Sequence, residues 1–290
     1  MGICDRAHET TTLVIGGTGK TGRRVAERLV ARGVPVRIGS RSGVPPLDWE
    51  DQATWVPVLQ GVESAYITYY PDLAVPGAAD VVRSLAKLAV GHGVRRMVLL
   101  SGRGEDGALL GERAIQDSGV NWTIVRSSWF SQNFSEYFLL DSILSGEVVL
   151  PVGNVAEPFV DAGDIADVAV AALTEDGHSG RVYEVTGPRL LTFAEAVAEI
   201  VQATGREIRF RPVAIDEYAS MLTQLNVPPV FVQLLSHLFT EVMDGRNAQT
   251  KDGVEQALGR MPRDFGDFAR ETAASGIWTA DNDDRAPRAA

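Results

Sequence analysis

The sequence has little of the two residue types that build most metal and disulfide sites. It contains one cysteine, Cys4, and its four histidines lie far apart, at His8, His92, His178 and His237. A single cysteine cannot form an internal disulfide framework, and these histidines do not have the spacing of zinc ligands. We therefore expect no metal and predict a protein of a reducing compartment, the cytoplasm.

The chain also lacks an excess of positive charge and a long apolar run. Its 290 residues include 27 Lys and Arg against 38 Asp and Glu, which gives a formal net charge of −11. Nucleic-acid phosphates are bound by basic surfaces, so this balance argues against nucleic acid as a partner. No apolar stretch of about 18 residues and no signal segment is present, so no membrane partner is expected either.

The pattern along the chain predicts an α/β fold of the doubly wound, Rossmann type. Short β-rich runs alternate with helical patterns, which is typical of a parallel sheet. The expected strands are 12–15, 35–38, 64–68, 96–101 and 122–126, and the expected helices between them are 20–31, 52–59, 77–91 and 107–118. Where a further strand would normally come, Pro45 and Pro46 predict a short or irregular segment.

The second half of the chain is expected to complete this domain and to add a smaller one. Helices are predicted at 134–144, 163–175 and 192–204, the last capped by Thr192, with strands at 182–185 and 207–211. Two or three further helices are expected between 215 and 274. The expected division is a flexible leader (1–11), a dinucleotide-binding Rossmann domain (12–150, its sheet completed by 155–187), a mostly helical substrate-binding part (188–279) and a disordered tail (280–290).

The most informative motif is a glycine-rich turn after the first expected strand. Gly17-x-Gly19-x-x-Gly22 stands between a strand and a helix, which is the context of the dinucleotide-binding fingerprint. Gly17 is expected to allow the tight turn, Gly19 to let the backbone approach a pyrophosphate, and Gly22 to let the helix pack on the strand. Backbone N–H groups at the helix start then face the anion. The predicted cofactor contacts in the turn are Gly16, Gly17, Thr18, Gly19, Lys20, Thr21 and Gly22.

A nucleoside-triphosphate P-loop is the alternative, because Gly19-Lys20-Thr21 matches the end of that motif. The P-loop requires a glycine where this chain has Val14. The spacing therefore favours a dinucleotide.

The end of the second expected strand indicates which dinucleotide is bound. An NAD site usually has an acidic residue about 20 residues after the glycines, where it accepts hydrogen bonds from the ribose 2′-hydroxyl. This chain has Ser40 and Arg41 there. Because a guanidinium binds a phosphate through two parallel hydrogen bonds, the pair favours the 2′-phosphate of NADP(H). A solvated Arg41 in a surface loop is the alternative.

Five segments together resemble the NmrA-like, atypical short-chain dehydrogenase/reductase family. They are residues 16–22, 93–102, 118–126, 129–134 and 161–169. Within the family the sequence looks most like the ergot-alkaloid (festuclavine-type) dehydrogenases and the actinobacterial ketoreductases that modify aromatic polyketides. The resemblance implies an NADPH-dependent ketoreductase of a cyclic aromatic secondary metabolite, as in antibiotic biosynthesis. Imine reductases, quinone reductases and catalytically silent redox sensors share the framework and remain alternatives.

The usual mechanism of short-chain dehydrogenases uses a tyrosine acid, a lysine four residues later and a serine. Ser101 matches the serine, but the expected helix at 107–118 contains neither tyrosine nor lysine. The usual proton donor is therefore missing, and assistance by a phenol of the substrate or by water is expected. The predicted catalytic residues are Ser101, Tyr66 and Asn133, with Tyr69 at the cofactor. A flat aromatic substrate is expected to contact Tyr70, Trp129, Phe130 and Phe134. Monomer and homodimer both remain open.

Overall fold

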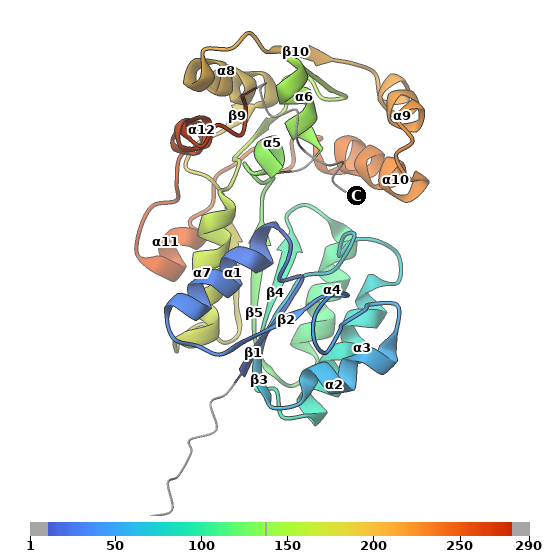
Figure 1. Ribbon diagram of the computed structural model, residues 1–290, viewed down its shortest axis with the longest axis vertical. Coiled ribbons are helices and arrows are strands. Elements are labelled where there is room, and N and C mark those ends of the chain that lie inside the picture. The colour runs from blue at the N-terminus through green and yellow to red at the C-terminus, as the bar shows by residue number, and fades with distance from the viewer. Residues whose placement is uncertain (1–10, 137, 280–290) are drawn as a thin grey trace, which may run out of the picture. The chain divides into compact units, whose positions relative to one another are not determined.

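The computed structural model describes residues 11–136 and 138–279, and the chain divides into two compact units (Figure 1). Unit 1 comprises Met1–Ser127, Ala162–Val185 and Asp252–Met261. Unit 2 comprises Ser128–Asp161, Thr186–Lys251 and Pro262–Ala290. This division differs from the predicted boundary near residue 150, because residues 128–150 belong to unit 2 and residues 252–261 return to unit 1. The predicted tail, and the predicted leader except Thr11, lie outside the described residues.

Unit 1 is built on a six-stranded parallel sheet. Its strands are β1 (Thr11–Ile15), β2 (Val36–Gly39), β3 (Val62–Ile67), β4 (Arg96–Gly102), β5 (Asn121–Ser127) and β8 (Arg181–Val185), in the order β2-β1-β3-β4-β5-β8. The chain turns from β1 to β2 on one side and then continues with β3 on the other side of β1. In open parallel sheets, ligands bind beyond the carboxyl ends of the strands at this reversal. The doubly wound fold predicted from the sequence is confirmed.

Helices cover both faces of this sheet (Figure 1). One face carries α1 (Lys20–Ala31) and α7 (Ala162–Thr174), which pack against each other. The other face carries α2 (Trp55–Leu59), α3 (Ala78–Gly91) and α4 (Asp106–Gln116). Apolar side chains from α2, α3 and α4 form one core with alternate residues of β1, β3 and β4, such as Leu13, Ile67 and Leu99. The short α11 (Gly253–Leu258) packs on α7 and β8.

The irregular segment that the two prolines predicted is present. Residues 40–51 form no strand, and the chain continues with a short 3-10 helix, η1 (Gln52–Thr54), and α2. Trp55 is buried, and its indole N–H donates to the main-chain oxygen of Asp48 at 2.7 Å. The five expected strands and four expected helices of this half are confirmed within about two residues, as sequence patterns allow.

Unit 2 combines helices with two small two-stranded sheets. Strand β6 (Glu147–Leu150) pairs in parallel with β10 (Arg209–Pro212), and β7 (Ala156–Glu157) pairs antiparallel with β9 (Leu191–Thr192). The helices are α5 (Asn133–Glu136), α6 (Leu139–Ser145), α8 (Phe193–Thr204), α9 (Ile215–Gln224), α10 (Pro229–His237), a π-helical turn η2 (Leu238–Val242) and α12 (Phe265–Ala274). The single helix predicted at 134–144 is therefore two. The predicted Thr192 cap is confirmed, because its hydroxyl accepts the Glu195 N–H at 3.1 Å.

Within residues 11–136 and 138–279, no helix is both long enough and apolar enough to cross a membrane.

Candidate cofactor and active site

The glycine turn joins the end of β1 to α1, and its most restricted residue is Gly16. This residue has a φ of +72°, and a Cβ there would overlap the Thr68 hydroxyl. The left-handed conformation that makes the turn tight therefore belongs to Gly16 and not, as predicted, to Gly17. A Cβ on Gly17 would lie 2.8 Å from the end of the Ile38 side chain. Gly17 thus packs closely against β2.

The two remaining glycines of the turn differ in what surrounds them. A Cβ on Gly22 would overlap the main-chain oxygen of Gly16 and lie 2.9 Å from the Gly17 Cα, so α1 packs directly on the turn. A Cβ on Gly19 would meet a single atom of the described chain, the Gly16 oxygen, at 3.3 Å. Gly19 is exposed and has an ordinary φ of −83°. The fold itself therefore tolerates a side chain at residue 19, whereas a ligand resting on the turn would not.

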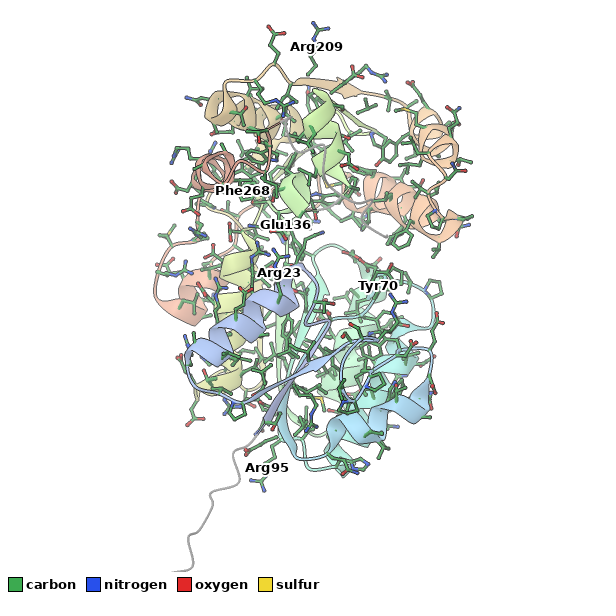
Figure 2. All side chains as sticks on the ribbon, viewed as in Figure 1. Arg23, Tyr70, Arg95, Glu136, Arg209 and Phe268 are labelled. Atoms are coloured by element: carbon green, nitrogen blue, oxygen red, sulfur yellow. The ribbon has the colours of Figure 1, made fainter. Side chains whose placement is uncertain are left out.

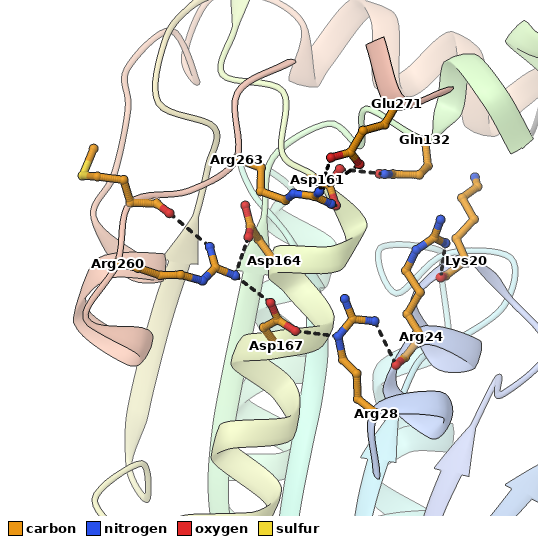
Figure 3. A network of polar contacts seen from close by, with 11 residues as sticks. Lys20, Arg24, Arg28, Gln132, Asp161, Asp164, Asp167, Arg260, Arg263 and Glu271 are labelled. Carbon is orange, nitrogen blue, oxygen red and sulfur yellow. Dashed lines mark hydrogen bonds and ion pairs between the residues drawn. The ribbon is translucent and has the colours of Figure 1, made fainter. Parts of the chain in front are cut away.

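The start of α1 is suited to bind an anion. Gly19 is the N-cap, no side chain of the described residues caps the helix, and its first turn has no acidic residue. The first N–H groups of a helix have no partner in the helix itself, and the helix dipole places partial positive charge there. Lys20 and Arg24 lie on successive turns of α1 (Figure 3), and Arg23 lies on the same helix (Figure 2). The diphosphate contact that the sequence predicts at this turn stays a prediction.

Ser40 and Arg41 follow β2, beside the glycine turn. The Gly16 N–H donates to the Gly39 oxygen at 2.9 Å, which joins the end of β2 to the turn. The Ser40 main-chain oxygen accepts from Gly43 and Leu47, so the following loop is closed. Arg41 is exposed, and no described residue forms a hydrogen bond or an ion pair with its guanidinium. Its charge is therefore available to a ligand, and its predicted contact with the 2′-phosphate stays a prediction.

The three tyrosines at the end of β3 have different environments. Tyr66 is 0% exposed under the start of α1, and burial raises the pKa of its hydroxyl more than the neighbouring Thr21 hydroxyl lowers it. Tyr66 is therefore a core residue in this structure, which argues against its predicted catalytic role. Tyr69 is half-buried against Trp49, with ring centroids 4.9 Å apart, whereas Tyr70 is exposed (Figure 2). Only Tyr69 and Tyr70 of the three are accessible for the contacts predicted for them.

Ser101, predicted to polarise a carbonyl, has its proton engaged elsewhere. Its hydroxyl donates to the buried Glu112 carboxylate at 2.6 Å. The same carboxylate accepts two hydrogen bonds from Arg126, at 2.8 and 2.5 Å, and Arg126 also pairs with Glu184 at 3.1 Å. Hydrogen bonding to Glu112 is the main cause that raises the Arg126 pKa. Because Ser101 has one proton and donates it to Glu112, the structure argues against its predicted role as the donor to a substrate.

Two carboxyl groups that sequence reasoning missed lie at the same edge of the sheet. Glu105 follows β4, and a Cβ on Gly102 would overlap its carboxyl group. Burial, followed by the negative charge of Asp72 and a hydrogen bond to it, raises the pKa of Glu105 to about 9. Glu105 Oε2 is buried and makes no hydrogen bond with the described residues. No motif marks this pair, because Asp72 and Glu105 come from different loops.

The other predicted substrate residues belong to unit 2. Phe134 is 0% exposed and packs against Phe159, Phe193 and Phe265, so it is a core residue and not a substrate contact. Trp129 and Phe130 are half-buried. The Trp129 ring packs on Phe239, with centroids 5.3 Å apart, and its buried indole nitrogen has no hydrogen-bond partner among the described residues. Asn133, the first residue of α5, is half-buried.

The Asp161-x-x-Asp164 segment has a structural role in each unit (Figure 3). In unit 1, Arg260 pairs with the buried Asp164 at 2.8 Å and with Asp167 at 2.6 Å, and Asp167 also accepts from Arg28. These pairs connect α7 with α1 and with the segment after α11. In unit 2, Asp161 accepts from Gln132 at 3.0 Å. Among the described residues, no group of three or more His, Cys, Asp and Glu side chains is arranged to hold a metal.

No family model matches the chain, but curated proteins do. It is 34% identical to the (4-alkanoyl-5-oxo-2,5-dihydrofuran-3-yl)methyl phosphate reductase of Streptomyces griseus, over 90% of this chain and 97% of that protein. It is 31% identical to a festuclavine dehydrogenase of Aspergillus fumigatus, over 91% and 98% of the two chains. It is 30% identical to the NAD(P)H azoreductase of Xenophilus azovorans, again over 91% and 98%.

Solved structures share the fold at lower identity. The Citrobacter triphenylmethane reductase complexed with NADP(H) superposes with a TM-score of 0.69 at 19% identity, over 92% of this chain and 99% of that one. An NADPH-dependent quinone oxidoreductase of Escherichia coli, complexed with NADPH, gives 0.72 at 21% identity, over 90% and 99%. Nmra, a negative transcriptional regulator in complex with NAD, gives 0.67 at 17%, over 93% and 98%.

Proposed function

Because the chain belongs to the NmrA-like, atypical short-chain dehydrogenase/reductase family, we propose that it is an NADPH-dependent reductase of a carbonyl group on a cyclic, aromatic small molecule. The observation that carries this proposal is the glycine turn. The start of α1 has no side-chain cap among the described residues, and Gly19 stands at a position where the fold itself tolerates a side chain. Relatives over nearly the whole chain are named as NAD(P)H-dependent or dehydrogenating enzymes, which supports an oxidoreductase.

Residues of unit 1 would hold the cofactor. The N–H groups of the turn at 16–22 and of the first turn of α1 would bind the diphosphate. Arg41, with the Ser40 hydroxyl, would bind the 2′-phosphate and so favour NADPH over NADH. When bound, the reduced nicotinamide supplies the two electrons of the reduction as a hydride. The protein's own task is then to orient the acceptor and to provide a proton.

The aromatic residues that remain accessible support a flat substrate. In unit 1, Tyr70 is exposed and Tyr69 is half-buried; in unit 2, Trp129 and Phe130 are half-buried. Aromatic side chains stack favourably on ring systems, and partly exposed rings are available to do so. Among the relatives, the Streptomyces griseus reductase is named after a dihydrofuran, which is a ring compound and supports a cyclic substrate. Reduction of a cyclic imine or of a quinone by the same residues is the nearest alternative.

A redox sensor that binds NADPH without turnover is the second candidate. Two observations favour the sensor: the Ser101 hydroxyl already donates its proton to Glu112, and α4 contains neither tyrosine nor lysine. The two candidates differ in turnover, which can be followed through the absorbance of NADPH with a panel of hydroxyaryl ketones, aliphatic ketones, quinones and cyclic imines. We expect hydroxyaryl ketones to stimulate NADPH oxidation most. If no compound does so while NADP⁺ and NADPH bind with different affinities, the protein is a sensor.

A further inference from the structure

We propose that the carboxyl group of Glu105, paired with Asp72, is the proton donor of this reductase and takes the place of the tyrosine that α4 lacks. The inference rests on the proposed function and deepens it. It assigns the acid to a residue that matches no motif of the sequence.

The position of Glu105 is the first argument. It lies in the turn between β4 and α4, four residues after Ser101, and its carboxyl group lies against Gly102 at the end of β4. The carboxyl end of β3 adjoins the strand reversal, where ligands bind in this type of sheet, and β4 is the next strand. A side chain on Gly102 would occupy the place of the carboxyl group. Glu105 therefore lies at the sheet edge where a reacting carbonyl is expected.

The second argument is that the partner carboxyl group is held in place. Asp72 belongs to the loop after β3, and its Oδ1 accepts the Ala74 N–H at 2.7 Å. This loop packs closely on α4, because a Cβ on Gly107 would lie 2.9 Å from the Ala74 Cα and one on Gly111 would lie 2.6 Å from the buried Leu73 side chain. The loop that carries Asp72 is therefore packed against the helix that Glu105 precedes.

The third argument is the protonation state that this placement enforces. Burial disfavours the charged form of Glu105, and the Asp72 carboxylate disfavours it further. Together, burial and the Asp72 charge raise the pKa of Glu105 to about 9. The other charged residues of the same turn are Arg103, which is buried, and Asp106, which is exposed. At neutral pH Glu105 is thus an acid with a proton to give.

The chemical step is balanced as follows. The carbonyl carbon gains a hydride from NADPH, the reductant of the proposed function, while the Glu105 O–H bond breaks and its proton goes to the carbonyl oxygen. The acceptor becomes an alcohol, NADPH becomes NADP⁺, and Glu105 becomes a carboxylate. Because of the nearby Asp72 charge this carboxylate is unstable, and it takes a proton from water before the next turnover. Asp72 acts through Glu105 and is a positioning residue.

Two kinds of hydride acceptor separate this role from a structural one. A ketone needs a proton to become an alcohol, whereas a triarylmethyl cation or an N-alkylated cyclic iminium accepts a hydride and needs none. We expect Glu105→Gln to lower the rate with a hydroxyaryl ketone by roughly 100-fold or more, within the range known for general acids, and to leave the rate with the cations within about threefold. An equal loss with both kinds of acceptor, or no loss with the ketone, would overturn the proposal. If the wild-type protein reduces none of them, the proposed function fails, and the proton-donor role fails with it.

The protonation state can be measured without cofactor or turnover. The infrared spectrum of the free protein at pH 7 should contain a carboxylic acid C=O band that is lost in Glu105→Gln and titrates with an apparent pKa of about 9. Asp72→Asn removes the repelling charge, so the band should titrate at lower pH, and the alkaline limb of the ketone pH profile should shift in the same direction. Asp106→Asn changes an exposed acid in the same turn and is the matched control, expected to shift neither. A Glu105 that is ionised at pH 7 would refute the assignment.

Discussion

Replacing Gly19 by alanine should separate the stability of the fold from the affinity for its cofactor. The added Cβ would meet one atom of the described chain, the Gly16 oxygen at 3.3 Å, and the φ of −83° suits any residue. The main cost to the fold is therefore the poorer N-cap, because alanine caps helices less well than glycine, by about 1 kcal/mol or less. The variant should fold and unfold almost as the wild type does.

The same methyl group should be far more costly for a bound diphosphate. Residue 19 is exposed at the start of α1, where the backbone must approach the phosphates closely. Moving the phosphates away by the radius of a methyl group would break one or two hydrogen bonds to charged oxygens, each contributing about 1.5–3 kcal/mol. A loss of about 3 kcal/mol corresponds to roughly 100-fold weaker NADPH binding.

Calorimetric titration with NADPH and urea unfolding measure the two effects on the same protein. Gly91→Ala is the matched control, because a Cβ at that helical position meets no atom of the described chain within 4 Å. It should lower neither the affinity for NADPH nor the free energy of unfolding. Gly22→Ala should lower both stability and affinity, because its Cβ would lie 2.7 Å from the Gly16 carbonyl carbon, and overpacking of this kind costs about 1–3 kcal/mol. Wild-type affinity in a folded Gly19→Ala variant would refute the assignment of the turn to the diphosphate.

Three further substitutions test other parts of the structure. Arg41→Ala should weaken NADPH binding by roughly 10- to 100-fold and NADH binding by much less, whereas the exposed Arg113→Ala should weaken neither; equal losses for both dinucleotides would show that Arg41 does not bind the 2′-phosphate. Glu105 has a folded-state pKa of about 9, above its ordinary value, so its contribution to stability is complete below pH 4.5 and is lost as the pH rises through 9. From pH 5 to pH 8, Glu105→Gln should therefore gain stability over the wild type by on the order of 4 kcal/mol, because each pH unit between 4.5 and 9 costs the wild type about 1.4 kcal/mol. A difference in unfolding free energy that does not grow with pH would contradict the buried acid. Arg126→Leu leaves the buried Glu112 without its cation and should cost about 3–5 kcal/mol in unfolding free energy, while a cost under about 1 kcal/mol would mean that the pair adds little.

The elements of unit 1 could be predicted because their signals are local. Apolar runs such as Leu13–Ile15 end at glycines, and the proline pair correctly predicted an irregular segment before α2. The glycine spacing located the start of α1. The membership of each segment in a unit is not a local property, however. Residues 252–261 have no pattern that assigns them to unit 1, and only their packing on α7 and β8 does so.

The candidate site was less predictable, because it depends on which way side chains face. Ser101 occupies the expected place, yet the phase of α4 brings Glu112 against its hydroxyl. Phe134 lies in an amphipathic pattern in which a core ring and a ligand-binding ring look alike, and the structure buries it completely. The pairing of Glu105 with Asp72 arises from two loops that the sheet brings together. Such a contact between two loops produces no motif in the sequence from which it could be predicted.

A crystal structure of the protein with NADP⁺ and an aromatic ketone tests the central claim most directly. The account predicts the diphosphate on the N–H groups of residues 16–22, the 2′-phosphate on Arg41, and the ketone oxygen within hydrogen-bond distance of the Glu105 carboxyl group. A diphosphate bound elsewhere, or a ketone oxygen that no atom of Glu105 approaches, would contradict it.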